Sequence, residues 1–417
     1  MLITLLAYYS AESYVDEPGD LWSAGLPLSL RDQAFRLVPT DDAGLRWVQP
    51  DGRPMTELDD PARTTSEGTT PASMQAMLDR DTVGGAVLYP SATALAYSAF
   101  ADSELLSAVL NTYNEWVLGL AAADPRRLKA LAVLNIDDPA DCARDMRRWA
   151  GRGAAGFVLP CAPGEGRRYD QRRYEVLWRT AADLGRPVSL LMGTGRAPGR
   201  RSANTTGQGT DGAAAPSAEA TPTAAAVLAF HATSVFPTRR SLTAIIFAGV
   251  FERYPALRIG AVGFGAGWAA YAMVRADEMY EVRPERAGPP TRVPASIRSP
   301  ADDVDAEIGA IAGGERSGTR GMAPEGVGYY FPPGERFSDH FRRHVFLTFR
   351  KDELALSVPE FINADMLLWG QGRRSAGAEP ADTARRDEFL AGVAEGDRAK
   401  LTRDNTARLY GFDVTAA

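Results

Sequence analysis

Eight short apolar runs, separated by longer amphipathic segments, constrain the fold of this chain more than any other feature. The runs lie at residues 2–9, 83–90, 128–136, 154–161, 187–193, 257–264, 344–350 and 366–370. Their lengths and flanking residues are typical of buried strands. Strands that alternate with helices form parallel sheets, and eight such units favour a closed (β/α)8 TIM barrel. No Gly-x-Gly-x-x-Gly motif follows the first run, which argues against a dinucleotide-binding fold.

Helical spacing of apolar residues is clearest at residues 103–123, where we predict a helix with Ser103 as N-cap that ends before Pro125. Two further helices are predicted at 174–184 and 241–253.

Three stretches lack periodicity, and we interpret them as loop insertions in a single barrel domain spanning residues 1–417. They are residues 17–72, 195–223 and 283–335. The first two follow predicted strands directly, so we expect them on the C-terminal face, where barrel active sites are built. The composition of residues 195–223 buries too little apolar area to offset ordering, which predicts a mobile loop.

Composition excludes several classes of protein. The net charge is −7, which gives no electrostatic reason to expect nucleic acid or an anionic membrane as partner. No apolar run reaches the roughly 18 residues of a membrane span, and the apolar N-terminus is interpreted as a core strand, not a signal peptide. Two cysteines are too few for a disulfide framework. We therefore expect a cytoplasmic protein with a small-molecule substrate, and the sequence leaves a homodimer open.

Histidine is scarce, with only His231, His340 and His344 in the chain. Because histidine is the commonest ligand of catalytic zinc, a multi-histidine metal site is hard to build here. His340 and His344 precede the seventh strand. They are therefore expected at the N-terminal end of the barrel, the end whose residues serve stability, and we interpret both as structural. His231 is the histidine expected to approach the active-site end.

Several segments occur in the order found in one known family. They are ESYVDEPGDLW, VLYP, YNEWV, RLKALAVL, YDQRRYEVLWRTAADLGRPVSLLMGTG, IIFAGVFERYPALRI, GAGWAAY, LLWGQ and RDNTARLYGF. Together they resemble the amidohydrolase-2 family, which includes aminocarboxymuconate-semialdehyde decarboxylase, over nearly the whole chain. The resemblance implies a barrel and metal-dependent hydrolysis or decarboxylation.

The departures from that family fall on the positions that hold its metal. The two ligand positions at the end of the first strand carry Glu12 and Tyr14, and the others match Leu191, Phe264 and Gly372. A catalytic metal needs three or four donor atoms, and the last three side chains offer none. We therefore predict a divergent member without cofactor, whose purified form carries no stoichiometric zinc, iron or manganese.

Three residues are candidates for catalysis. Glu12 could act as a general base, or remain as a loop-bridging carboxylate. Tyr14 could donate a hydrogen bond to a substrate, or fill the volume left by a histidine and its metal. His231 is either catalytic or a satisfied core residue.

Four more residues are candidates for substrate binding. Arg196 and Arg373 follow the fifth and eighth strands, where a guanidinium can bind a carboxylate or phosphate, although arginine-rich surfaces are often only solvated. Tyr89 and Trp268 match common family residues, and they line the pocket or serve packing.

Two functions remain open from the sequence. The first is a metal-independent enzyme, such as a decarboxylase, cyclase or isomerase, that acts on a small organic acid or polyketide-like metabolite of specialised metabolism by acid–base catalysis. The second is a non-catalytic binding or regulatory barrel. A third hypothesis keeps the metal-dependent activity of the family, with other ligands.

Overall fold

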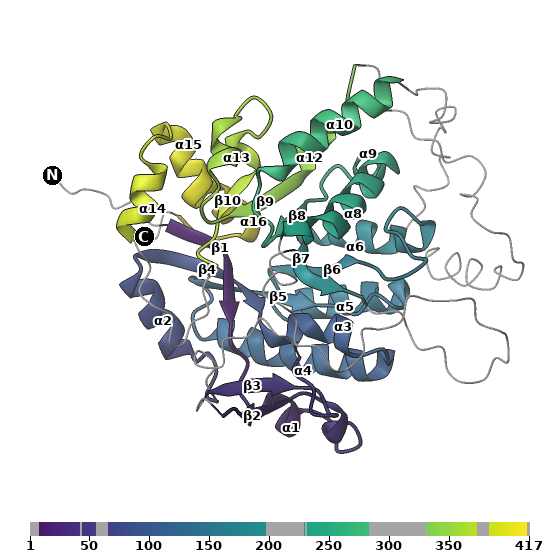
Figure 1. The fold of residues 1–417 in the computed structure, drawn as a ribbon, viewed down its shortest axis with the longest axis vertical. Coiled ribbons are helices and arrows are strands. Elements are labelled where there is room, and N and C mark those ends of the chain that lie inside the picture. Colours follow the sequence, from purple (N-terminus) through teal and green to yellow (C-terminus); the bar gives the residue numbers. More distant parts are fainter. Residues whose placement is uncertain are drawn as a thin grey trace, which may run out of the picture.

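A computed structural model shows eight parallel strands arranged as a nearly closed barrel with helices around it, which confirms the predicted α/β barrel (Figure 1). The structure describes residues 8–41, 44–55, 66–196, 229, 232–282, 331–332, 334–372 and 383–414. In barrel order the strands are β1 (Tyr8–Val15), β4 (Val83–Pro90), β5 (Leu128–Val133), β6 (Gly156–Ala162), β7 (Val188–Gly195), β8 (Ile259–Val262), β9 (Val345–Phe349) and β10 (Leu367–Trp369). Strand interiors are almost wholly buried, so the barrel forms the centre of the core.

Strands β1 and β10 meet where the barrel closes. The backbone N–H of Gly372 donates to the carbonyl of Glu12 at 2.9 Å. A Cβ at Gly370 would lie 2.6 Å from the Cβ of Glu12, so this close approach needs a glycine. The closure therefore places the end of β10 directly beside Glu12.

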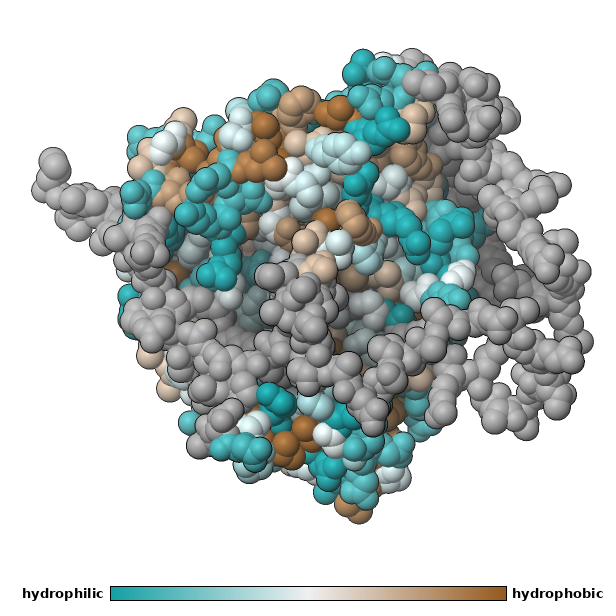
Figure 2. Space-filling model, viewed as in Figure 1, coloured by the Kyte–Doolittle hydropathy of each residue, from teal (hydrophilic) through white to brown (hydrophobic). Residues whose placement is uncertain are grey.

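The helices cover the outside of the barrel. They are α1 (Leu21–Gly25), α2 (Pro71–Arg80), α3 (Ala96–Ala99), α4 (Ser103–Ala122), α5 (Pro139–Gly151), α6 (Glu175–Leu184), α8 (Val235–Phe247), α9 (Val250–Arg253), α10 (Trp268–Val282), α12 (Phe337–His344), α13 (Glu353–Ser357), α14 (Thr383–Leu390), α15 (Glu395–Ala399) and α16 (Asn405–Tyr410). Among the helices described, none is both long and apolar enough to cross a membrane. Apolar and polar side chains are interspersed over the face shown in Figure 2.

The predicted helices are present, with two differences at their ends. The N-cap of α4 is Asp102, whose side chain accepts from the N–H of Leu105, and not Ser103. The segment predicted at 241–253 contains two helices, because Gly249 adopts a left-handed backbone conformation (φ +68°) that separates α8 from α9.

The first strand was predicted at residues 2–9, and this prediction is wrong in its position. Strand β1 runs from Tyr8 to Val15, and residues 1–7 lie outside the described ranges. The stretch that pairs with β4 is more polar than residues 2–9, and its pairing is irregular between Ser10 and Ser13. Glu12 and Tyr14 therefore lie inside a barrel strand, not in a loop after it.

Residues 17–72 contain regular structure that the sequence analysis did not predict. Besides α1, they form an antiparallel hairpin of β2 (Arg36–Pro39) and β3 (Leu45–Val48). Fully buried Trp22 packs edge-on against Phe35 and Trp47, with ring centroids 5.2 and 4.9 Å away. The other two predicted insertions fall almost wholly outside the described ranges, including the loop predicted to be mobile.

His340 and His344 lie on α12, near the N-terminal end of the barrel, as predicted. The buried ring of His344 stacks on Phe251 at 4.5 Å, and its Nδ1 lies 3.3 Å from the carbonyl of Leu257. Burial, the dominant influence, lowers the pKa of His344 from 6.5 to about 4.

This lowered pKa predicts a pH-dependent stability. Between pH 6.5 and about 4 the unfolded chain binds a proton at His344 that the folded chain does not, so stability is lost as the pH falls through this window. The loss amounts to up to about 3 kcal/mol. Urea unfolding of wild type and His344→Gln at pH 7 and pH 4 checks this. The variant is expected to show the smaller difference, and equal differences would contradict the assignment.

Candidate active site

Glu12 lies at the floor of the C-terminal mouth of the barrel. Its side chain is 5% exposed, and its Oε2 accepts a hydrogen bond from the hydroxyl of Thr348 on β9. That hydroxyl in turn accepts from the backbone N–H of Gly263, just after β8, at 3.1 Å. Half-buried Tyr14 also hydrogen-bonds the Glu12 carboxylate. Residues from β1, β8 and β9 therefore converge on one carboxyl group.

Burial is the largest influence on this carboxyl and raises the pKa of Glu12 above its usual value. The hydrogen bonds from Thr348 and Tyr14 and the positive charge of Arg350 oppose the rise without cancelling it. A carboxyl whose pKa is raised keeps a larger protonated fraction near neutral pH than an exposed one. Glu12 can therefore serve as a proton donor as well as an acceptor.

Arg350 directly follows β9, at the rim of the same mouth, and was not among the predicted site residues. Its side chain is exposed and lies within electrostatic range of Glu12. Gly372, with φ +56°, leaves room for its stem, because a Cβ there would lie 2.5 Å from the Arg350 Cδ. Its position at the C-terminal end of a predicted strand was the signal that could have identified it.

Tyr89 lies inside the barrel, beneath this mouth. It is fully buried, and its hydroxyl lies 2.8 Å from that of Ser189 on β7 and 3.2 Å from that of Tyr410 on α16. Burial raises the pKa of Tyr410 to about 12 and that of Tyr89 well above its usual value. Both hydroxyls therefore stay protonated, and Tyr89 supports the floor without reaching solvent.

Arg196 does not face the mouth as predicted. Its Nε and Nη2 donate to the two oxygens of Asp137, at 2.9 and 2.6 Å. The remaining donors reach the carbonyls of Tyr97, Phe100 and Ala101. All five N–H groups are therefore used within the protein, and none is left to bind a substrate.

The other predicted residues divide into one that packs and two that the structure does not describe. Trp268 begins α10, where its indole N–H donates to the carbonyl of Gly265 at 3.0 Å and its ring meets Phe341 edge-on. This arrangement favours packing over pocket lining. His231 and Arg373 lie outside the described ranges.

The side-chain donors described around Glu12 are few for a catalytic transition metal. Among the described residues, the side chains that hydrogen-bond the Glu12 carboxyl are the hydroxyls of Tyr14 and Thr348. Leu191 is fully buried and has an apolar side chain, and Gly263 and Gly372 have no side chain that could bind a metal. A zinc-like ion needs three or four nitrogen, oxygen or thiolate ligands.

A group of potential metal ligands does exist elsewhere, so the expectation that the chain lacks such a set is not confirmed. Donor atoms of Glu252, Glu335 and His340 lie within 4.8 Å of one another. Burial lowers the pKa of His340, which favours the neutral ring that binds metals. Only His340 is named among the residues considered from the sequence, because Glu252 and Glu335 are far from each other in the chain.

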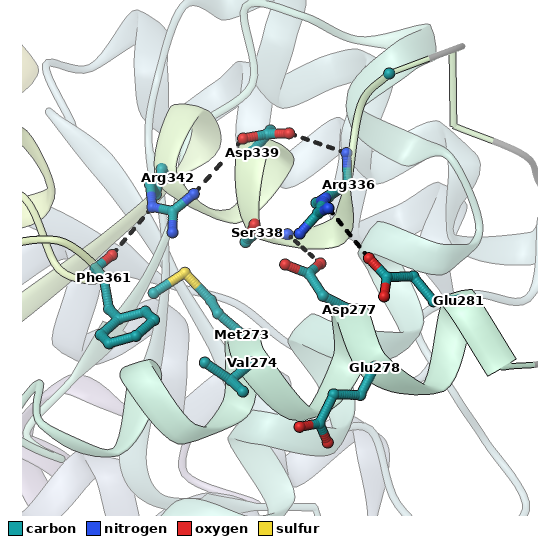
Figure 3. A pocket seen from close by; sticks show the side chains of 11 residues that line it. Met273, Val274, Asp277, Glu278, Glu281, Arg336, Ser338, Asp339, Arg342 and Phe361 are labelled. Atoms are coloured by element: carbon teal, nitrogen blue, oxygen red, sulfur yellow. Dashed lines mark hydrogen bonds and ion pairs between the residues drawn. The ribbon is translucent and has the colours of Figure 1, made fainter.

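Two concave regions lie away from the mouth. Figure 3 shows a groove between α10 and α12, in which Glu281 pairs with Arg336 and Asp277 accepts a hydrogen bond from the N–H of Ser338. A second is lined by residues at the N-terminal end of the barrel, including Arg258 and His344. Neither includes a residue of the candidate site.

An eight-stranded parallel barrel with polar groups at the carboxyl ends of its strands defines the class of TIM-barrel proteins. Within that class, the model of the amidohydrolase family (Amidohydro_2) matches residues 62–287, more than half of the chain. The chain therefore belongs to the amidohydrolase family. A comparison with curated proteins gave no match.

Solved structures share the fold over almost the whole chain. An amidohydrolase from Mycobacterium avium subsp. paratuberculosis K-10 is 16% identical, with a TM-score of 0.63 and coverage of 97% of this chain and 99% of its own. The 5-carboxyvanillate decarboxylase LigW from Sphingomonas paucimobilis is 17% identical (TM-score 0.59, coverage 98% and 100%). A manganese-bound dihydroxybenzoic acid decarboxylase from Polaromonas sp. JS666 is 17% identical (TM-score 0.55, coverage 97% and 96%).

Proposed function

We propose that this chain is a decarboxylase-like lyase that protonates a small carboxylated compound through Glu12, without a metal ion at the barrel mouth. The observation that carries the proposal is the buried carboxyl of Glu12, held by Thr348 and Tyr14 at the active-site end of the barrel. The similar structures named as decarboxylases of carboxyvanillate and dihydroxybenzoic acid support an aromatic acid as the substrate class.

The residues of the mouth supply the parts of such a reaction. Arg350 pairs with the substrate carboxylate and holds the substrate over the floor. Protonated Glu12 gives its proton to the carbon that bears the carboxylate, which forms a C–H bond. The C–C bond to the carboxylate then breaks, its electron pair returns to the ring, and CO2 leaves. Glu12 recovers a proton from water.

Tyr14 has a positioning part in this proposal. Its hydroxyl is half-buried beside the Glu12 carboxyl, where it donates to the ionised form left after proton transfer. Thr348 donates to the same carboxyl from β9. These preorganised donors favour the state in which Glu12 has lost its proton, and so lower the cost of the transfer.

The proposal is tested with a panel of hydroxybenzoic acids that includes 5-carboxyvanillate, by measuring CO2 release and substrate loss. We expect turnover of at least one compound at 25 °C that persists in excess chelator. Turnover that requires added Mn²⁺ would instead favour the metal-dependent chemistry suggested by the manganese-bound relative. Tight binding of an acid without product would favour a binding barrel.

A further inference from the structure

A second cluster of chemically active side chains lies at the end of the barrel wall away from Glu12. Glu252 lies on α9, which precedes β8, and Glu335 lies two residues before α12, which carries His340 and runs directly into β9. Because α9 comes shortly before β8 and α12 leads directly into β9, the cluster lies at the N-terminal end of the barrel. It is therefore separate from the mouth and from the family's metal position.

The geometry of the cluster leaves two buried atoms unsatisfied. His340 is 1% exposed, and its Nε2 lies 2.9 Å from Oε2 of Glu335. Although the two atoms are within ion-pair distance, neither has a hydrogen-bond partner within the described part of the chain. Leaving buried polar atoms unpaired costs about 1–3 kcal/mol each, so such a pair needs an explanation.

We propose that His340, Glu335 and Glu252 bind one divalent transition-metal cation such as Zn²⁺ or Mn²⁺. Two ligand atoms about 2.1 Å from one ion are about 3.0 Å apart at the right angle of an octahedral site and about 3.4 Å apart at the tetrahedral angle, so the Nε2–Oε2 separation of 2.9 Å is close to the octahedral value. The third ligand is near, because ligand atoms of Glu252, Glu335 and His340 all lie within 4.8 Å of one another. In the empty site Oε1 of Glu252 lies 3.2 Å from Nδ1, the other ring nitrogen, so the Glu252 side chain turns toward the ion on binding. One imidazole with two carboxylates is a donor set that such ions accept.

The surroundings of the three side chains suit an ion at this place. Phe331 stacks on the His340 ring at 4.6 Å and fixes its orientation. The two carboxylate side chains are 32% and 30% exposed, so water can complete the coordination shell. Arg343, the nearest cation, contacts the other oxygen of Glu335, Oε1, at 3.4 Å and leaves Oε2 free for the metal.

The bound cation has a structural role in this proposal. It joins two parts of the chain: α9, which precedes β8, and the segment of Glu335 and α12, which precedes β9. Strand β9 carries Thr348, the hydrogen-bond donor to Glu12. The metal therefore stabilises the wall that positions the mouth, without touching a substrate. Binding raises the unfolding temperature because the unfolded chain lacks the assembled ligand set.

The test uses the full chain, freed of metal with chelator and then titrated separately with ZnCl2 and MnCl2 by calorimetry and thermal unfolding. We expect one ion per chain for at least one metal, and a higher unfolding temperature on binding. Glu335→Gln and Glu252→Gln should each weaken binding by about tenfold or more. Both residues are partly exposed, so the variants should fold even where His340→Gln does not.

Two control variants locate the ion. Glu278→Gln, which changes an exposed carboxylate paired with Arg275 outside the cluster, should bind the metal as wild type does. Glu12→Gln should bind it equally well, because the mouth is not involved. The proposal fails if neither metal binds, if the Glu335 and Glu252 variants bind as wild type does, or if binding is lost in Glu12→Gln.

Discussion

Replacing Glu12 by glutamine is expected to lower turnover of the substrate by about 10²–10⁴-fold, the usual contribution of general acid–base catalysis. Glutamine keeps the size of the side chain and still accepts the hydrogen bond from Thr348, but it has no proton to give. Steady-state kinetics should show the loss mainly in kcat, because the chain keeps Arg350 for binding. The CO2 assay with the best substrate of the panel measures it.

The same substitution has a predicted effect on pH dependence. The pKa of folded Glu12 is raised by burial, so wild-type turnover should fall as the pH rises through that value and the proton donor is lost. A raised carboxyl pKa also means that stability is lost as the pH rises, because the folded chain must release a proton that it holds more tightly. Glu12→Gln should therefore be no less stable than wild type at neutral pH.

One control variant and one second variant of the site are compared with Glu12→Gln. Glu353→Gln removes an exposed carboxylate just beyond β9 and should leave turnover unchanged. Tyr14→Phe removes one of the donors to Glu12 but leaves those of Thr348 and the Gly263 backbone, so it should reduce turnover less than Glu12→Gln does. If Glu12→Gln and Tyr14→Phe both turn over at the wild-type rate, the site has been assigned to the wrong residues.

The barrel could be predicted because a buried strand appears in the sequence as a short, continuous apolar run. Seven of the eight predicted runs overlap the observed strands from β4 onward, since a buried parallel strand has to be apolar on both faces. The first strand was predicted at the wrong position because apolarity was the criterion. Residues 2–9 are more apolar than β1, whose interior contains Ser10, Glu12 and Ser13. Polar residues that face the inside of a barrel cannot be distinguished from a loop by apolarity alone.

The candidate site was only partly predictable, because its contacts join residues distant in the chain. The alignment with a known family identified Glu12 and Tyr14, and the structure places them together. Thr348 and Arg350 were missed, although both lie at the end of a predicted strand. No local pattern shows that a threonine in an apolar strand points at a glutamate 336 residues away. The cluster of Glu252, Glu335 and His340 was missed for the same reason.

Arg196 was predicted at the mouth because arginine after a barrel strand often binds anions, and the structure assigns it to the fold instead. Its side chain is 2% exposed and pairs with Asp137, which is 16% exposed. Burial raises the pKa of Asp137, but hydrogen bonds and the charge of Arg196 outweigh burial and leave the pKa below its usual value. The pair therefore stays ionised and ties the end of β7 to the segment that follows β5.

Replacing Arg196 by methionine is expected to lower the free energy of unfolding by about 3–5 kcal/mol, as measured by urea denaturation. Methionine keeps most of the apolar stem but leaves Asp137 with the weaker contact to Arg167, at 3.3 Å, and the hydrogen bond from Ser103. It also removes the Arg196 donors from the carbonyls of three residues. Arg168→Met is the matched control, because it breaks a more exposed pair with Asp170 and should cost less than about 1 kcal/mol. A stability equal to wild type, together with a raised KM for the acid, would restore the predicted role of Arg196 in substrate binding.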